Sequence, residues 1–268
     1  MIRDFENIDY LKSGNARQRS AYEILTKYEI ITLLKAFNPI LVGTIPINID
    51  LETSDLDIIC KYSDKNSFIE LMKGLFGNKE GFLVGKRSEY DAIVCHFWLD
   101  GFEIEIFAQD IPTKHQNGYR HMLIEYKLLV EKGESFRLKI IELKKQGHKT
   151  EPAFGIALEL KGDPYKELVE LFLMDERRQL ILAELKKQCE EKQIYEFDYY
   201  WEIWGVMWYP WFMEFYSGAS LSFTANDISS EDLNYFVETG ELELIKVYER
   251  HEMIDEFDRV RFRLKTRI

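Results

Sequence analysis

Two aspartates separated by one residue are the clearest sign of chemistry in this chain. Asp55 and Asp57 stand at the start of an apolar run, with Leu56 between them and Ile58 after them. If the run is a strand, side chains two positions apart point to the same side, so the two carboxylates share a face while Leu56 and Ile58 enter the core. Two like charges so placed repel each other, and a divalent cation would relieve that repulsion by taking carboxylate oxygens. The pattern therefore predicts a metal site.

A third carboxylate is expected from a later stretch in which acids alternate with apolar residues. Asp100-Gly101 separates two apolar runs, 91–99 and 102–108, and both residues tolerate positive φ, so the runs predict a β-hairpin. Glu103 and Glu105 share one face of its second arm. If this arm lies beside residues 56–62, one of the two completes a triad of acids. Glu105 is the first choice because it lies deeper in the apolar run, and Glu103 is placed at the rim.

The elements that must position these acids follow from hydrophobic spacing. Helices are expected over 15–37, 66–76, 116–131, 135–146 and 163–190, and a short buried strand over 40–42. Asn38-Pro39 ends the first helix, and turns are expected around Gly77 and Gly81. The order predicts an α+β fold, in which a mixed β-sheet is packed with helices.

The composition changes after Glu190. From there to Ile268 the chain has 17 acidic and 8 basic residues, and four of the five tryptophans lie in 201–211. A helix start is expected at 229–232 and a closing hairpin from 242–249 and 259–265. The basic residues of 259–265 are expected to pair with Glu241 and Glu243 across this hairpin. We interpret residues 1–185 as one domain and 186–268 as a small, acidic, aromatic-rich α+β domain, whose tryptophans form either a core or a stacking platform.

Bulk properties exclude several classes of partner. The net charge of −12 argues against nucleic acid, whose affinity comes largely from Lys and Arg. There is no apolar run of about 18 residues and no signal-peptide pattern, so neither membrane insertion nor export is predicted. Cys60 and Cys95 lie in apolar runs and predict buried thiols, which suits a cytoplasmic location.

In order and spacing, these residues resemble the nucleotidyltransferase superfamily of the polymerase-beta type. Its mark is an apolar residue, Gly, and Ser or Gly, then about ten residues later Asp, an apolar residue, and Asp or Glu, with a further carboxylate on a later strand. Val42-Gly43-Thr44, Asp55-Leu56-Asp57 and Glu105 look like that pattern. Over residues 15–175 the chain also resembles a bacterial family of uncharacterised stand-alone domains with this fold, in the stretches 41–47, 54–60, 119–125, 149–154 and 162–165.

The resemblance implies a nucleotidyltransferase-like fold and an activity that moves a nucleoside monophosphate from a nucleoside triphosphate to a small-molecule or protein acceptor. It implies Mg2+ or Mn2+ as the cofactor, which bridges the phosphates of the triphosphate. Thr44 would offer its hydroxyl and an amide at a helix N-terminus. The implied site consists of catalytic metal ligands at Asp55, Asp57 and Glu105, and nucleotide contacts at Gly43, Thr44 and Ser54.

A second interpretation comes from the apolar loop at 45–49, where many members have a basic or small polar residue. It is a non-catalytic nucleotide-sensing or protein-interaction module, regulatory or toxin-neutralising, on the same fold. His121 and Glu125 stand four apart on one expected helix, so His121 is either a hydrogen-bonded helical histidine or, with Arg120, part of the site rim. The sequence also offers five cations as phosphate partners: Lys61, Lys86, Arg87, Lys114 and Arg120.

Overall fold

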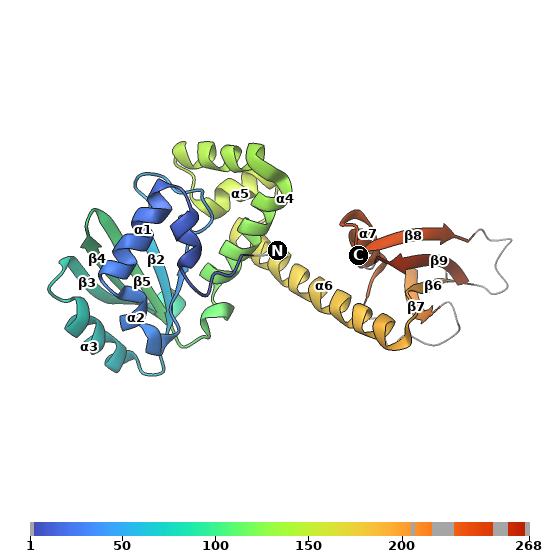
Figure 1. The fold of residues 1–268 in the computed structure, drawn as a ribbon, viewed down its shortest axis with the longest axis horizontal. Helices are drawn as coiled ribbons and strands as arrows, with labels where there is room; N and C mark the ends of the chain where they lie inside the picture. The colour runs from blue at the N-terminus through green and yellow to red at the C-terminus, as the bar shows by residue number, and fades with distance from the viewer. Residues whose placement is uncertain (1–2, 205–206, 216–227, 249–256, 266–268) are drawn as a thin grey trace. The chain divides into compact units, whose positions relative to one another are not determined.

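The computed structural model describes residues 3–204, 207–215, 228–248 and 257–265 (Figure 1). The chain divides into two compact units, Met1–Leu173 and Met174–Ile268. Helix α6 (Pro164–Lys192) contains this division, and the predicted domain boundary at residue 185 also falls within it. The two units are described one after the other.

The first unit is built on a five-stranded mixed sheet in the order β1-β2-β5-β4-β3. Its strands are β1 (Ile40–Val42), β2 (Leu56–Lys61), β3 (Glu80–Arg87), β4 (Ala92–Leu99) and β5 (Phe102–Gln109). β2 and β5 are parallel, and the other neighbours are antiparallel. The predicted hairpin is confirmed: Asp100 and Gly101 connect β4 to β5 with φ of 44° and 84°. The turn predicted around Gly81 was wrong, because β3 pairs along β4 through an irregularity at Glu80–Leu83.

The helices of this unit are α1 (Ala16–Lys27), α2 (Ile30–Leu33), α3 (Lys65–Phe76), α4 (Asn117–Lys145), α5 (Thr150–Leu158) and the first part of α6. The single helix predicted over 15–37 was wrong in its middle, because Glu29 adopts a left-handed φ of 51° between α1 and α2. The two helices predicted at 116–131 and 135–146 meet at Gly133 inside α4, where φ is 77°. The α+β fold, with a mixed sheet packed with helices, is confirmed.

The two faces of the sheet pack against different helices. On one face Leu56 and Ile58 belong to a core that includes residues of α1 and α3. On the other face Ile59 packs with residues of α4, α5 and α6. Asp57 lies two positions before Ile59, so its side chain is on the face toward α4–α6. The sheet therefore directs this carboxylate toward the helices that follow it in the chain.

The second unit is a four-stranded antiparallel sheet in the order β7-β6-β9-β8. Its elements are β6 (Glu196–Trp204), β7 (Met207–Phe215), α7 (Ser230–Glu238), β8 (Leu242–Val247) and β9 (Phe257–Leu264). The predicted pairing of 242–249 with 259–265 is confirmed as β8–β9, where Arg263 forms an ion pair with Glu243 at 3.3 Å. The tryptophan side chains of 201–211 lie outside the described residues, so the choice between core and platform stays a prediction.

The cysteines agree with the sequence interpretation. Cys60, Cys95 and Cys189 are free and buried, and burial raises the pKa of the Cys95 thiol to about 12. None of the described helices combines the length and apolarity needed to cross a lipid bilayer.

Candidate active site

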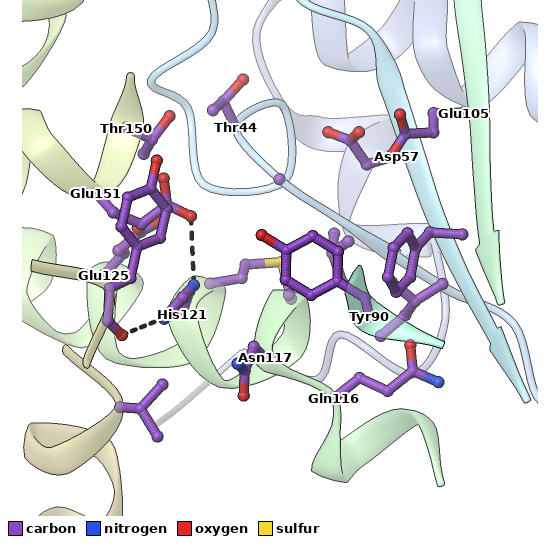
Figure 2. A pocket seen from close by; sticks show the side chains of 18 of the residues that line it. Thr44, Asp57, Tyr90, Glu105, Gln116, Asn117, His121, Glu125, Thr150 and Glu151 are labelled. Carbon is purple, nitrogen blue, oxygen red and sulfur yellow. Dashed lines mark hydrogen bonds and ion pairs between the residues drawn. The ribbon is translucent and has the colours of Figure 1, made fainter. Parts of the chain in front are cut away.

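The predicted acids meet at the parallel pair of strands. Asp57 of β2 is the register partner of Glu105 of β5, so their side chains lie next to each other on the face toward α4–α6. Asp55 precedes β2 by one residue. Figure 2 shows Asp57 and Glu105 on the same side of a pocket, approaching from the two neighbouring strands. The conditional prediction that Glu105 lies beside the aspartates is therefore confirmed as a matter of register.

These carboxyls carry more negative charge than their surroundings balance. Burial raises the pKa of Asp57 well above its ordinary value, and the charges of Asp55 and Glu105 raise it further. Burial also raises the pKa of Glu105, opposed by His96, whose ring Nε2 lies 3.5 Å from the Glu105 carboxyl. Asp57 and Glu105 are thus harder to ionise in this site, which is the electrostatic condition that a bound cation relieves.

Gly43 brings the backbone up to this group of acids. Its φ is 81°, a left-handed conformation that favours glycine. A Cβ at this position would lie 2.3 Å from Oδ2 of Asp57, far inside van der Waals contact. Only a residue without a side chain allows the chain to pass this close to the Asp57 carboxyl, so the Gly and the Asp form one local arrangement.

The loop that follows Gly43 is a turn, and the helix N-terminus predicted at Thr44 was wrong. Asn48 adopts a left-handed φ of 61°, and Ile45, Ile47 and Ile49 are 1%, 3% and 0% exposed. These side chains enter the two cores on different sides, which a helix with one apolar stripe would not allow. The apolar residues that looked out of place beside a nucleotide site are anchors of the loop.

Cationic and amide side chains hold the same loop through its backbone. The Nζ of Lys144 donates to the carbonyl of Ile49 at 2.8 Å, and Lys144 is itself buried. Thr44 donates its hydroxyl to Ser54 Oγ at 3.2 Å, and Ser54 Oγ also accepts the Leu51 amide. Carbonyls in and next to the loop also accept from side chains elsewhere in the unit: Arg3, Arg17, Gln18 and Arg137. The loop therefore presents Gly43, Thr44 and Ser54 from a fixed backbone.

The acids line one wall of a cavity of about 1170 Å³. All six residues predicted for the core of the site line it: Gly43, Thr44, Ser54, Asp55, Asp57 and Glu105. Of the three predicted rim residues, His121 lines it, whereas Glu103 and Arg120 do not. Glu103 instead lies 3.4 Å from Nδ1 of His96. Of the five cations offered as phosphate partners, Arg87 alone lines the cavity.

The opposite wall is formed by α4, α5 and α6, and much of it was not predicted. His121 Nε2 lies 2.9 Å from the backbone carbonyl of Tyr165, and its Nδ1 lies 3.3 Å from Glu151 Oε1 (Figure 2). The Tyr165 carbonyl can only accept, so Nε2 donates to it, while Nδ1 faces the Glu151 carboxylate. Although burial acts in the other direction, the hydrogen bond from His121 lowers the pKa of Glu151, which is therefore ionised near neutral pH.

The sequence contained partial signals for this wall. The sequence showed His121 and Glu125 four positions apart on one expected helix, and it showed the stretch 149–154 as part of the family resemblance. No local pattern indicated that α5 would bring Glu151 to His121. Lys144 and Tyr165 also line the cavity from distant positions in the chain. Their convergence depends on how three helices pack, which spacing along one segment does not report.

The donor set fits a divalent metal in kind, since Mg2+ and Mn2+ take carboxylate oxygens. It is not assembled as a closed cluster: within the described ranges, no three His, Cys, Asp or Glu side chains are grouped so as to hold a metal ion. Asp55, Asp57 and Glu105 are the residues that would hold it. Binding of a metal by these three acids is therefore part of the proposed function.

A family model described as "Domain of unknown function (DUF4269)" matches residues 23–171. The chain belongs to this family. The match covers more than half of the chain and includes every residue that lines the cavity. No curated protein matches the sequence.

Several solved structures are similar to part of this chain at low sequence identity. A cytoplasmic RNA terminal U-transferase has a TM-score of 0.36 at 12% identity, covering 47% of this chain and 38% of that one. The Cid1 poly(U) polymerase with MgGTP has a TM-score of 0.39 at 13% identity, and the match covers 59% of this chain and 50% of that one. The polymerase core of TRAMP, an RNA surveillance complex, has a TM-score of 0.38 at 14% identity, and the match covers 66% of this chain and 52% of that one. The chain spans about half the length of these proteins or less, and their substrates do not carry over to it.

Proposed function

We propose that this protein is a metal-dependent nucleotidyltransferase of the polymerase-beta type, which moves a nucleoside monophosphate from a nucleoside triphosphate to an acceptor. One observation carries the proposal. Asp57 and Glu105 pair in register on parallel strands, with Asp55 beside them and Gly43 against Asp57, at the wall of a large cavity. This is the residue pattern of the superfamily brought together in three dimensions.

In the proposed transfer, an acceptor hydroxyl attacks the α-phosphorus of the triphosphate and forms a new O–P bond. The bond between the α-phosphorus and the oxygen that bridges to the β-phosphate breaks, so pyrophosphate leaves, and the hydroxyl proton is released. Mg2+ or Mn2+ held by Asp55, Asp57 and Glu105 would neutralise the charge that develops on the phosphates. The fixed turn after Gly43 orients the Thr44 and Ser54 hydroxyls beside the same position.

Cations that line the cavity are candidates for the outer phosphates. Arg87 comes from the end of β3, and Lys166 from the first turns of α6. Lys144 lies deeper, and burial lowers the pKa of its amine while the charges of Glu125 and Asp55 oppose that shift. Since the Lys144 amine is engaged with the loop backbone, Arg87 and Lys166 are the side chains that we assign to phosphate binding.

Turnover of α-labelled nucleoside triphosphates tests the proposal. The protein is incubated with Mn2+ or Mg2+, each of the four triphosphates and a deproteinised cell extract as the source of acceptors, and labelled product and pyrophosphate are measured. We expect turnover that Asp57→Ala abolishes and Glu103→Ala preserves, since Glu103 lies outside the cavity lining. Binding of the triphosphate without any turnover would instead favour the non-catalytic, nucleotide-sensing alternative.

A further inference from the structure

One buried acid on the far wall of the cavity has no role in the proposed transfer. Glu125 of α4 is 3% exposed, yet it lines the cavity. Among the residues that the structure describes, no side chain or backbone group donates a hydrogen bond to its carboxyl. Its oxygens are not sealed off in the protein but open onto the cavity, so a ligand that enters the cavity can become their hydrogen-bond partner.

The neighbours of Glu125 do not supply the missing partner. Its nearest charges are Glu151, which is ionised, and Lys144, whose Nζ donates to the Ile49 carbonyl. The ring of His121 faces Glu151 with one nitrogen and the backbone carbonyl of Tyr165 with the other. Burial and the Glu151 charge together raise the pKa of Glu125 well above its ordinary value. Asp163, Lys166 and Glu170, at and just before the start of α6, also line the cavity, so acids outnumber cations on the far wall.

The chemistry of this wall selects its ligand. An anion would meet the Glu151 charge, and an apolar group would leave the Glu125 oxygens unsatisfied. An ammonium group supplies up to three donors and the missing positive charge. Tyr165 also lines the cavity, and its ring lies 6.1 Å from that of His121, so an aromatic group of the kind that cations approach is close to this wall.

We infer that Glu125 and Glu151 bind the ammonium group of a primary-amine acceptor, opposite the acids assigned to the metal. This inference rests on the proposed function, because it names the class of acceptor for the same site. Figure 2 shows Glu125 and Glu151 on the side of the pocket away from Asp57 and Glu105. An acceptor held by its amine at one wall extends a hydroxyl across the cavity toward the other.

Matched probes test the inference with the full chain. The thermal shift produced by 1,5-diaminopentane is compared with that of 1,5-pentanediol, which has the same length and no charge. The diamine is expected to raise Tm and the diol to leave it unchanged, because a ligand that binds only the native state stabilises it. Glu125→Gln, which keeps the size and removes the group that can ionise when an ammonium binds, is expected to weaken diamine binding by about tenfold or more. Glu131→Gln, an exposed position on the same helix, is expected to bind as the parent does.

Two further measurements separate the alternatives. Asp57→Asn is expected to keep diamine binding. If it abolishes the shift, the diamine is occupying the metal acids and the inference is overturned. It is equally overturned if the parent does not respond to the diamine, or if both Glu125→Gln and Glu151→Gln bind it normally. A shift with Mn2+ and a non-hydrolysable triphosphate is recorded in the parent, Glu125→Gln and Glu151→Gln as proof of folding, and the circular dichroism spectrum serves this purpose for Asp57→Asn. If that shift is absent in the parent while the diamine binds, the proposed function fails and the amine site stands.

Discussion

Replacing Gly43 by alanine tests the arrangement around Asp57, and the chain contains a matched control. Gly43 and Gly101 have nearly the same positive φ, 81° and 84°. A Cβ at Gly101 would meet no atom within 4 Å, whereas one at Gly43 would lie 2.3 Å from Oδ2 of Asp57. The two substitutions therefore share a backbone cost, and Gly43→Ala adds a collision with one carboxylate oxygen.

The shared cost can be worked out. A left-handed alanine costs about 1–2 kcal/mol. For a unit of this size, 1 kcal/mol corresponds to about 2–4 °C in Tm, so each variant should melt about 2–8 °C below the parent. The oxygen at Gly43 is the far end of a side chain that can turn away. The additional effect should therefore appear as a displaced Asp57 carboxylate and not as a large further loss of stability.

The assay is the rise in Tm with Mn2+ and a non-hydrolysable triphosphate. At a ligand concentration of about 100 times Kd, the stabilisation is about 2.7 kcal/mol, or roughly 5–11 °C. Gly101→Ala should keep this rise and Gly43→Ala should lose most of it. The reasoning is refuted if Gly43→Ala responds to the ligand as fully as Gly101→Ala does.

Three other substitutions have predicted directions. Asp57→Asn, measured in EDTA, should raise Tm by about 2–4 °C at neutral pH and flatten its pH dependence. The reason is that the folded pKa of Asp57 is raised, so the native state binds more protons than the unfolded chain and loses stability as pH rises above about 4. Asp232→Asn should lower the free energy of unfolding by about 2 kcal/mol above pH 4. The reason is that the Ser229 amide, Arg177 and Arg178 lower the pKa of Asp232 from 3.8 to about 2 despite its burial. Urea denaturation followed by tryptophan fluorescence measures this free energy. Lys144→Met should cost about 1.5–3 kcal/mol by thermal melting, since the Ile49 carbonyl loses a charged donor.

Each of these predictions has an outcome that would contradict it. For Asp57→Asn it is a lower Tm in EDTA, which would mean that the carboxylate is stabilised by groups other than a metal. The Asp232→Asn difference must shrink as pH falls from about 4 toward 2, where the parent carboxyl also becomes protonated, and a constant difference would exclude the ionic explanation. For Lys144→Met the control is Lys145→Met at the exposed neighbouring position, and equal effects of the two would remove the role assigned to the loop contact.

The parts of the fold with a clear local pattern could be predicted from the sequence. β5 follows from its alternation of apolar and acidic residues, the turn before it from Asp100-Gly101, and β4 and the strand at Ile40–Val42 from apolar runs that are mostly buried. β3 was missed because it is an exposed strand with Gly81 and Gly85 inside it and little alternation to detect. The break at Glu29 was missed because a left-handed residue there has no sequence signal comparable to glycine.

The candidate site divides in the same way. The wall with Asp55, Asp57 and Glu105 was predictable, because short strand patterns place these acids on one face and the superfamily pattern supplies their order. The wall with His121 and Glu151 was not, because the pairing depends on the packing of α4 against α5. A histidine and a glutamate thirty positions apart become a pair only when the tertiary structure is known.

The most direct test of the proposed function is a crystal structure of the protein soaked with Mn2+ and a non-hydrolysable nucleoside triphosphate. We expect an anomalous manganese peak among the carboxylates of Asp55, Asp57 and Glu105, with the phosphates beside Gly43 and Thr44. A triphosphate bound elsewhere, or bound in this cavity with no manganese at these carboxylates, would contradict it.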